Sequence, residues 1–250
     1  KDADVNITVN NTAANVTDDN VTAINALQAA TTGTITATID GNSAQLANLT
    51  ETGDNATMAL TITVDNAATA SDGKTITEAT SVATVAFTVG INDTFAAVTD
   101  GTGVHANMQA VDAKDADVNI TVNDAAVANV SADNVTAINA LQGATTGTVT
   151  ATIDGNAAEL DGLTASGTTA TMALTITVDD TATAVAGAAI ADATSLANTG
   201  VNFALGITDS FAAVTDGTGV HANIDKIDAK DADVNITVND AAVANVSADN

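Results

Sequence analysis

The chain has 250 residues, and its 31 acidic residues against five lysines give a formal net charge of −26. Such a charge excludes binding to nucleic acid or anionic membranes through basic patches, since both need clustered Lys or Arg. The absence of cysteine excludes disulfides and thiol chemistry. With no Trp or Tyr and only four Phe, the interior must consist of small aliphatic side chains, which favours a thin, regular core.

The acidic balance also bears on the setting in which the protein works. Repulsion among so many carboxylates is tolerated in high salt or with bound divalent cations, because salt shortens the range of interactions between exposed charges. We therefore expect an extracellular, saline, calcium-containing setting. No apolar run has the length needed to insert into a membrane. The sequence starts and stops inside a repeat, and we interpret it as part of a longer array or as a processed product.

An internal repeat organises the chain. The motif Lys-Asp-Ala-Asp-Val-Asn-Ile-Thr-Val-Asn begins at residues 1, 114 and 230. We predict repeat 1 at residues 1–113 and repeat 2 at residues 114–229, each with four coils, followed by the start of repeat 3 at residues 230–250. A stack of repeats has no fixed domain size, so the usual expectation from length does not apply.

Four segments of repeat 2 alternate apolar and polar residues, which is the period of a strand with one buried face. Their apolar residues are Val118/Ile120/Val122, Val149/Ala151/Ile153, Leu174/Ile176/Val178 and Phe203/Leu205/Ile207. The segments recur about every 25–30 residues, a spacing that is typical of repeat coils and too long for hairpins.

Short segments with helical spacing lie between these strands. Ser131 is expected to cap a helix that Gly143 ends. The apolar sets that predict helices are Val135/Ile138/Leu141, Ala157/Leu160/Leu163, Ile190/Ala193/Leu196 and Val220/Ile224/Ile227. Strand, short helix and next strand form a crossover unit, which makes neighbouring strands parallel and is nearly always right-handed.

The predicted fold class is therefore α/β, a right-handed repeat solenoid with one parallel sheet and short helices. The alternative is a parallel β-helix that is mainly β, because helices of two turns are marginal on their own.

Residues 132–153 read Ala-Asp-Asn-Val-Thr-Ala-Ile-Asn-Ala-Leu-Gln-Gly-Ala-Thr-Thr-Gly-Thr-Val-Thr-Ala-Thr-Ile. This wording resembles the repeats of giant cell-surface proteins of marine cyanobacteria and other aquatic bacteria, in which Ala/Asn/Leu helices alternate with Thr-Gly-Thr-Val strands. The resemblance covers nearly the whole chain in style. It implies a secreted, non-enzymatic role in a surface layer, filament, adhesin or motility apparatus, and it transfers no site residue.

Alternating oxygen ligands predict a calcium site in each repeat motif. In a strand, residues two apart share a face, so three such side chains can meet one cation. The candidate ligands are Asp2, Asp4 and Asn6, then Asp112, Asp115, Asp117 and Asn119, and finally Asp228, Asp231, Asp233 and Asn235. The spacing is not that of an EF-hand, because Ile120 stands where the glycine is needed. The competing interpretation is a solvated polar face with Lys114 as counter-charge.

Polar residues, mostly carboxylates, also follow the strands, at Asn123/Asp124, Asp154, Asp179/Asp180 and Asp209. Stacking would place them about 5 Å apart, so that either cations bridge the column or each Asp accepts bonds from turn amides. We favour the second interpretation.

Other polar residues give weaker signals. Four threonines are predicted to face away from the core: Thr121, Thr152, Thr175 and Thr177. Flat Thr arrays suit ice or polysaccharide binding, although Thr also packs well in strands. His105 and His221 occur once per repeat without a second His or a Cys, so a surface or packed histidine is favoured over zinc.

No pair of acids lies among aromatic residues, and no nucleophile has a partner set, so we predict that the protein is not an enzyme. The expected function is that of a stiff structural rod that associates with copies of itself at the cell surface, with polysaccharide as a further candidate partner. The alternative is the calcium-stiffened stalk of a bacterial adhesin.

Overall fold

The computed structural model describes residues 4–13, 16–53 and 55–240. The chain forms two compact units, which we describe separately. Unit 1 comprises residues 1–100, 104–123 and 144–147, and unit 2 comprises residues 101–103, 124–143 and 148–250. These units follow from contacts within the fold, whereas the predicted repeats at residues 1–113 and 114–229 follow from sequence identity, and their bounds differ.

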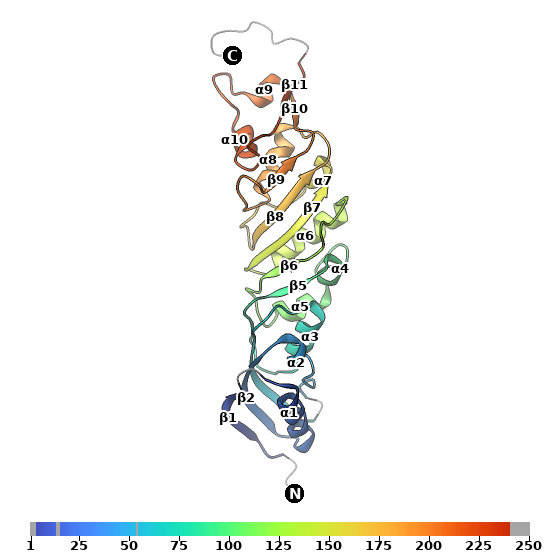
Figure 1. Cartoon of the computed structure of the whole chain (residues 1–250), viewed down its shortest axis with the longest axis vertical. Coiled ribbons are helices and arrows are strands. Elements are labelled where there is room, and N and C mark those ends of the chain that lie inside the picture. Colours follow the sequence, from blue (N-terminus) through green and yellow to red (C-terminus); the bar gives the residue numbers. More distant parts are fainter. Residues whose placement is uncertain (1–3, 14–15, 54, 241–250) are drawn as a thin grey trace. The chain divides into compact units, whose positions relative to one another are not determined.

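Unit 1 contains parallel strands joined by short helices (Figure 1). Its elements are β1 (Ile7–Ala13), α1 (Asp18–Ala30), β2 (Thr34–Gly41), α2 (Ser43–Leu46), β3 (Thr57–Val64), α3 (Ala70–Glu78), β4 (Val85–Phe87), β5 (Ile91–Asp93), α4 (Phe95–Val98), α5 (Ala106–Asp112) and β6 (Ile120–Val122). Strands pair in the order β1-β2-β3-β4, and β5 pairs with β6. These four pairings are all parallel.

Unit 2 repeats the same succession. Its elements are α6 (Ala132–Ala144, of which the last residue falls in unit 1), β7 (Thr148–Gly155), α7 (Ala157–Leu160), β8 (Thr171–Val178), α8 (Ala184–Asp192), β9 (Val201–Phe203), β10 (Ile207–Asp209), α9 (Phe211–Val214), α10 (Ala222–Asp228) and β11 (Ile236–Val238). Strands β7, β8 and β9 pair in parallel in that order, and β10 pairs in parallel with β11. The predicted mixed α/β class with parallel strands and short helices is confirmed.

Strict alternation of side chains forms the strands. Along β3, Met58, Leu60, Ile62 and Val64 are at most 1 % exposed, whereas the threonines between them lie on the other face. Burying each aliphatic side chain of this size stabilises the fold by about 1.5–3 kcal/mol. Strand β8 has the same sequence and the same pattern. The interior is therefore built from small aliphatic residues, as the composition predicts.

Polar N-caps start the helices. Ser131 Oγ accepts from the backbone N–H of Asn134 at 3.3 Å, so α6 begins where the sequence predicts. Thr17 caps α1 in the same way. The shorter helices differ from the prediction at their ends: Leu196 follows α8, and Val220 precedes α10 and is 55 % exposed.

The prediction of one strand with Phe203, Leu205 and Ile207 on its buried face is wrong. Two strands, β9 and β10, flank a turn in which Leu205 is 63 % exposed. Gly206 has φ +74°, and a Cβ there would lie 2.3 Å from the carbonyl oxygen of Asn235. Only glycine permits this backbone conformation together with so close an approach. Gly90 makes the equivalent turn in unit 1.

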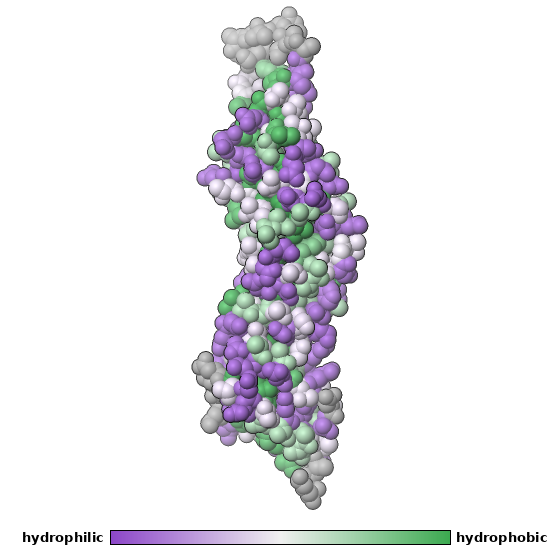
Figure 2. Space-filling model, turned by 45° about the vertical axis from the view of Figure 1, so that its right-hand side comes forward, coloured by the Kyte–Doolittle hydropathy of each residue, from purple (hydrophilic) through white to green (hydrophobic). Residues whose placement is uncertain are grey.

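Polar and apolar residues are mixed on the face that Figure 2 shows. In the view of Figure 2, hydrophilic residues cover much of the visible face, with small groups of apolar residues between them.

The lysines of the described residues use their charge in two ways. Lys74 and Lys226 form ion pairs with Glu78 and Asp192, whereas Lys114 and Lys230 donate to backbone carbonyls.

Candidate functional site

A groove in unit 1 contains three of the predicted calcium ligands, Asp115, Asp117 and Asn119. Its volume is about 660 Å³. One wall is formed by β3, with Thr61 and Thr63, and by β4. The other wall is the segment between α5 and β6, which contributes Asp115, Asp117 and Asn119. The structure therefore brings these three side chains to one surface feature.

Asp115 and Asp117 form a carboxylate pair in this groove. The segment leaves α5 in a tight turn, in which the N–H groups of Lys114 and Asp115 both donate to the carbonyl of Val111 at 2.9 Å. Asp115 Oδ2 then accepts from the backbone N–H of Phe87 at 2.7 Å. Burial raises the pKa of Asp115, the bond from Phe87 opposes the shift, and the hydrogen bond and charge of Asp117 add to it.

Unit 2 builds the same pair from Asp231 and Asp233. Asp231 is only 6 % exposed, and its Oδ2 accepts from the backbone N–H of Phe203 at 2.8 Å. Burial raises the pKa of Asp231 as well, followed in size by the opposing bond from Phe203 and the contributions of Asp233. Each pair thus joins the turn after a helix to the short strand of the preceding coil.

The lysine before each pair does not act as its counter-ion. Lys114 Nζ donates to the carbonyls of Thr80 and Val82 at 3.2 and 2.5 Å. Lys230 Nζ donates to the carbonyls of Thr194 and Leu196 at 2.8 and 2.7 Å. These carbonyls belong to the turns that precede β4 and β9, so each lysine fixes the turn of the neighbouring coil.

The remaining predicted ligands have other positions. Asp112 and Asp228 are the last residues of α5 and α10, and burial raises the pKa of Asp112. Asn6 Oδ1 accepts from the N–H of Thr34. The carbonyl of Asn235 accepts from Ile207. Asp4 lies just before β1, and Asp2 lies outside the described residues.

A metal site is not evident from acidic residues alone. Within residues 4–13, 16–53 and 55–240, no group of three or more His, Cys, Asp or Glu could hold a metal ion. The pairs of aspartates gain a third oxygen only by including an asparagine such as Asn119. Calcium binding at these motifs stays a prediction.

The carboxylates that follow the strands bond to backbone amides of the adjacent coil. Asp209 Oδ2 accepts from the N–H of Ala184 at 3.0 Å, at the start of α8. Asp180 Oδ1 accepts from Ala157 at the start of α7, and Asp154 Oδ1 accepts from Asn129. The preferred interpretation of these residues as acceptors of turn amides is confirmed for Asp154, Asp180 and Asp209. Negative charge at helix starts is favourable.

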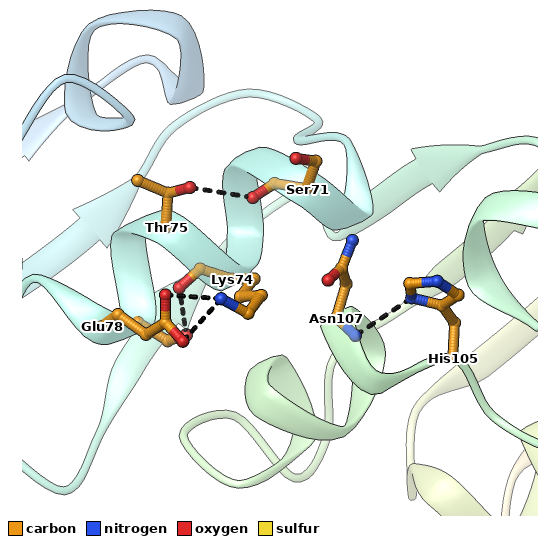
Figure 3. A network of polar contacts seen from close by, with 7 residues as sticks. Ser71, Lys74, Thr75, Glu78, His105 and Asn107 are labelled. Atoms are coloured by element: carbon orange, nitrogen blue, oxygen red, sulfur yellow. Dashed lines mark hydrogen bonds and ion pairs between the residues drawn. The ribbon is translucent and has the colours of Figure 1, made fainter.

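The two histidines are helix caps. His105 Nδ1 accepts from the backbone N–H of Asn107 at 3.1 Å at the start of α5 (Figure 3), and His221 does the same for Asn223. The capping bond occupies the lone pair of one ring nitrogen. The sequence favoured a surface or packed histidine over zinc and did not predict this capping role.

Sequence reasoning missed a set of side chains that join neighbouring coils. Thr31, Thr80, Thr145 and Thr194 are at most 5 % exposed. Each donates its hydroxyl to a carbonyl of the preceding strand or segment, at 2.7 Å in every case, to Val5, Leu60, Val118 and Leu174 respectively. Their regular place shortly before the next strand is the signal that could have revealed them.

Asparagine and glutamine side chains add to this set. Asn25 of α1 donates to the carbonyl of Asn48 and accepts from the N–H of Thr50, and Asn139 of α6 makes the same two bonds in unit 2. The buried side chain of Gln28 donates to the carbonyl of Glu51. The repeated wording Asn-Ala-Leu-Gln is the sequence signal for this pattern.

Comparisons with known proteins add no assignment: no protein-family model, curated protein or solved structure matches the chain. Among the described residues, no helix has the length and apolar character needed to cross a membrane.

Lys114 offers a direct test of the coil-joining bonds. Lys114→Met keeps the apolar stem but removes two charge-assisted bonds, so we expect the free energy of unfolding to fall by about 1.5–3 kcal/mol. Lys74→Met is the matched control, because it makes the same charge change in the half-exposed Lys74–Glu78 pair of Figure 3 and should cost at most about 1 kcal/mol. Urea unfolding measures both. Equal losses would contradict the role given to Lys114.

The carboxylate pair should make stability depend on pH. Because the pKa of Asp115 is raised above 3.8 in the folded state, the stability linked to its proton is complete below 3.8 and is lost as the pH rises through the raised value. Asp115→Asn can keep the bond from Phe87 and donate to Asp117. We expect the variant to match or exceed the wild type in stability at pH 7, and this advantage to shrink towards pH 4. A variant less stable than the wild type at pH 7 would contradict this account.

Proposed function

We propose that this chain is a structural repeat region of an extracellular cell-surface protein. Its coils stack as a right-handed solenoid and form a stiff rod, which associates with copies of itself in a filament or surface layer. In this role the chain acts as a structural element and not as a catalyst. Polysaccharide of the cell surface is a further candidate partner through the exposed threonine faces of the strands.

The observation that carries this proposal is the recurrence of bonds between neighbouring coils. In both units, three kinds of side chain bond one coil to the next. A buried threonine donates to a strand carbonyl, an asparagine of the long helix accepts from a backbone N–H, and an aspartate after a strand accepts from the N–H at the start of a helix. Successive strands also pair in parallel. Parallel pairing through crossovers favours one hand, and a stack in which each coil contacts its neighbours favours a stiff, extended form. Asp115 of the groove makes a contact of the same kind, because it accepts from the backbone N–H of Phe87 in the preceding coil.

Composition supports the surface setting. A chain with 31 acids and five lysines remains soluble and resists non-specific association at low salt. Salt of marine strength shortens the range of the repulsion between exposed carboxylates to a few ångströms. Association of copies is then limited by the contacts between their surfaces. The resemblance to giant surface proteins of aquatic bacteria points to the same setting.

A second candidate is the calcium-stiffened stalk of an adhesin. The observation that favours it is the groove in which Asp115, Asp117 and Asn119 meet. Carboxylate and amide oxygens are the ligands that calcium prefers. A stalk of this kind would remain monomeric, and calcium at 100 times its dissociation constant would stabilise it by about 2.7 kcal/mol.

Electron microscopy of the purified chain at high salt, with calcium and then with chelator, tests the proposal. We expect ordered fibres or sheets in at least one condition, because stacking contacts and screened charges favour association. Dispersed single particles in every condition would overturn the structural role. The stalk would be favoured by single particles in which chelation lowers the melting temperature of the wild type but leaves that of Asp115→Asn unchanged.

A further inference from the structure

The outward side of the two long strands in unit 1 is an array of threonines. Alternate residues of β2 and β3 point away from the core and are exposed or half-buried. They are Thr34, Thr36, Thr38 and Asp40 on β2, and Thr57, Ala59, Thr61 and Thr63 on β3. The register places each residue of the first set beside its counterpart in the second, as with Thr38 and Thr61. Hydroxyl and methyl groups therefore form a regular surface.

Unit 2 carries the same surface on β7 and β8. Its outward residues are Thr148, Thr150, Thr152 and Asp154 on β7, and Thr171, Ala173, Thr175 and Thr177 on β8. Each matches its counterpart in unit 1 in residue type, and the pairing register is the same. We call each of these surfaces a threonine face. The two threonine faces of the chain are chemically alike.

The middle of each threonine face carries no charge. The chain has 31 acidic residues, yet the outward acid of each face is at its end, Asp40 in unit 1 and Asp154 in unit 2. Those two positions show that strands of this chain accept carboxylates. Thr has a high strand propensity of its own, so threonine alone would not indicate a partner. A neutral centre with charge at the border does, because depletion of charged residues at the centre and a polar rim characterise protein interfaces.

The charge of the chain indicates which partner fits a threonine face. Copies of a protein with a formal net charge of −26 repel one another, and like charges that face each other across an interface are unfavourable. At a threonine face, a second copy can approach without placing carboxylate against carboxylate in the centre. A Thr hydroxyl both donates and accepts, so hydroxyls that lose water can bond to those of the facing copy.

We propose that two copies of the chain dock by packing a threonine face of one against a threonine face of the other. The inference rests on the proposed self-association and names the surface through which it occurs. Identical faces meet about a two-fold axis, as sheets packed roughly 10 Å apart. Because the chain has two such faces, a copy that is docked through one can receive a further copy on the other, and association continues beyond the dimer.

Each single contact is expected to be weak. Two strands of eight residues cover roughly 300 Å², whereas a standard protein interface has about 800 Å² on each partner. Association should therefore require a high protein concentration. It should also require salt, because salt screens the repulsion between the aspartates at the border of the faces.

Substitutions of both charge signs in the full chain test the docking surface. T61K/T175K and T61E/T175E each place a charge in the middle of both faces. An unpaired charge is costly to bury whatever its sign, so both variants should raise the concentration at which half of the protein associates by roughly tenfold or more. If association depended on net charge alone, Lys would favour it and Glu would oppose it. Sedimentation velocity at high salt measures the concentration.

Thr136 provides the matched control. It is exposed on α6, so T136K and T136E make the same charge changes away from the threonine faces and should associate like the wild type. The single variant T61K retains one intact face and should stop at dimers. Urea unfolding checks that every variant folds.

A second measurement does not depend on charge. The native chain has no cysteine, so T61C and T136C each introduce a single thiol. A maleimide should modify the thiol of T61C several-fold more slowly in the associated protein than in dilute solution, because docking covers it. The rate for T136C should be the same in both states. An unchanged rate for T61C would overturn the docking surface.

The outcomes separate this inference from the proposed function. Loss of association with both Lys and Glu, together with slowed labelling of T61C, supports the docking surface. Opposite effects of Lys and Glu, or no effect of either, in a wild type that associates overturn it and leave the proposed function standing. A wild type that stays monomeric at high concentration and high salt overturns both. If that monomer binds insoluble cellulose and T61K/T175K does not, the threonine faces bind neutral polysaccharide instead of a second copy.

Discussion

The structure depends on satisfying the backbone of each coil where it meets the next. Parallel strands β2 and β3 pair in register over their whole length, as do β7 and β8. In the turn between α3 and β4, a buried threonine hydroxyl bonds the chain to the preceding strand: Thr80 Oγ1 donates to the carbonyl of Leu60 and accepts from the N–H groups of Leu60 and Val82. An unpaired buried amide is costly, so these hydroxyls fix where each coil begins.

The unusual charge of the chain follows from the same constraint. Aspartates that follow strands accept bonds from amides of the adjacent coil, as Asp209 does from Ala184, and so many carboxylates have a structural use. The lysines at positions 114 and 230 bind turn carbonyls, where a neutral residue would leave two acceptors without a donor. Asp231 also accepts such a bond, from Phe203, but it is buried beside the exposed Asp233, and burial raises the pKa of Asp231. A bound cation or a proton would reduce the repulsion between the carboxylates of Asp231 and Asp233.

The periodic parts of the fold were predictable and the irregular parts were not. Alternation in β8 and helical spacing after Ser131 each reflect a single face packed on the core, and both predictions are confirmed. The split at Gly206 escaped the same reasoning, because Leu205 continues the apolar alternation while the positive φ of the glycine turns the chain. The sequence predicted that Asp115, Asp117 and Asn119 meet because of strand period, but they lie in the turn that precedes β6, and the bond from Phe87 to Asp115 depends on packing between coils. No local pattern encodes that contact.

The most direct measurement of the central claim is the stability of Thr80→Val. Valine has nearly the same shape, so the substitution removes the hydroxyl and leaves buried backbone groups of Leu60 and Val82 unpaired. The account predicts a loss of about 2–6 kcal/mol in the free energy of unfolding, against a change within about 0.5 kcal/mol for Thr61→Val on the exposed face of β3. Equal, small effects of the two substitutions in urea unfolding would contradict it.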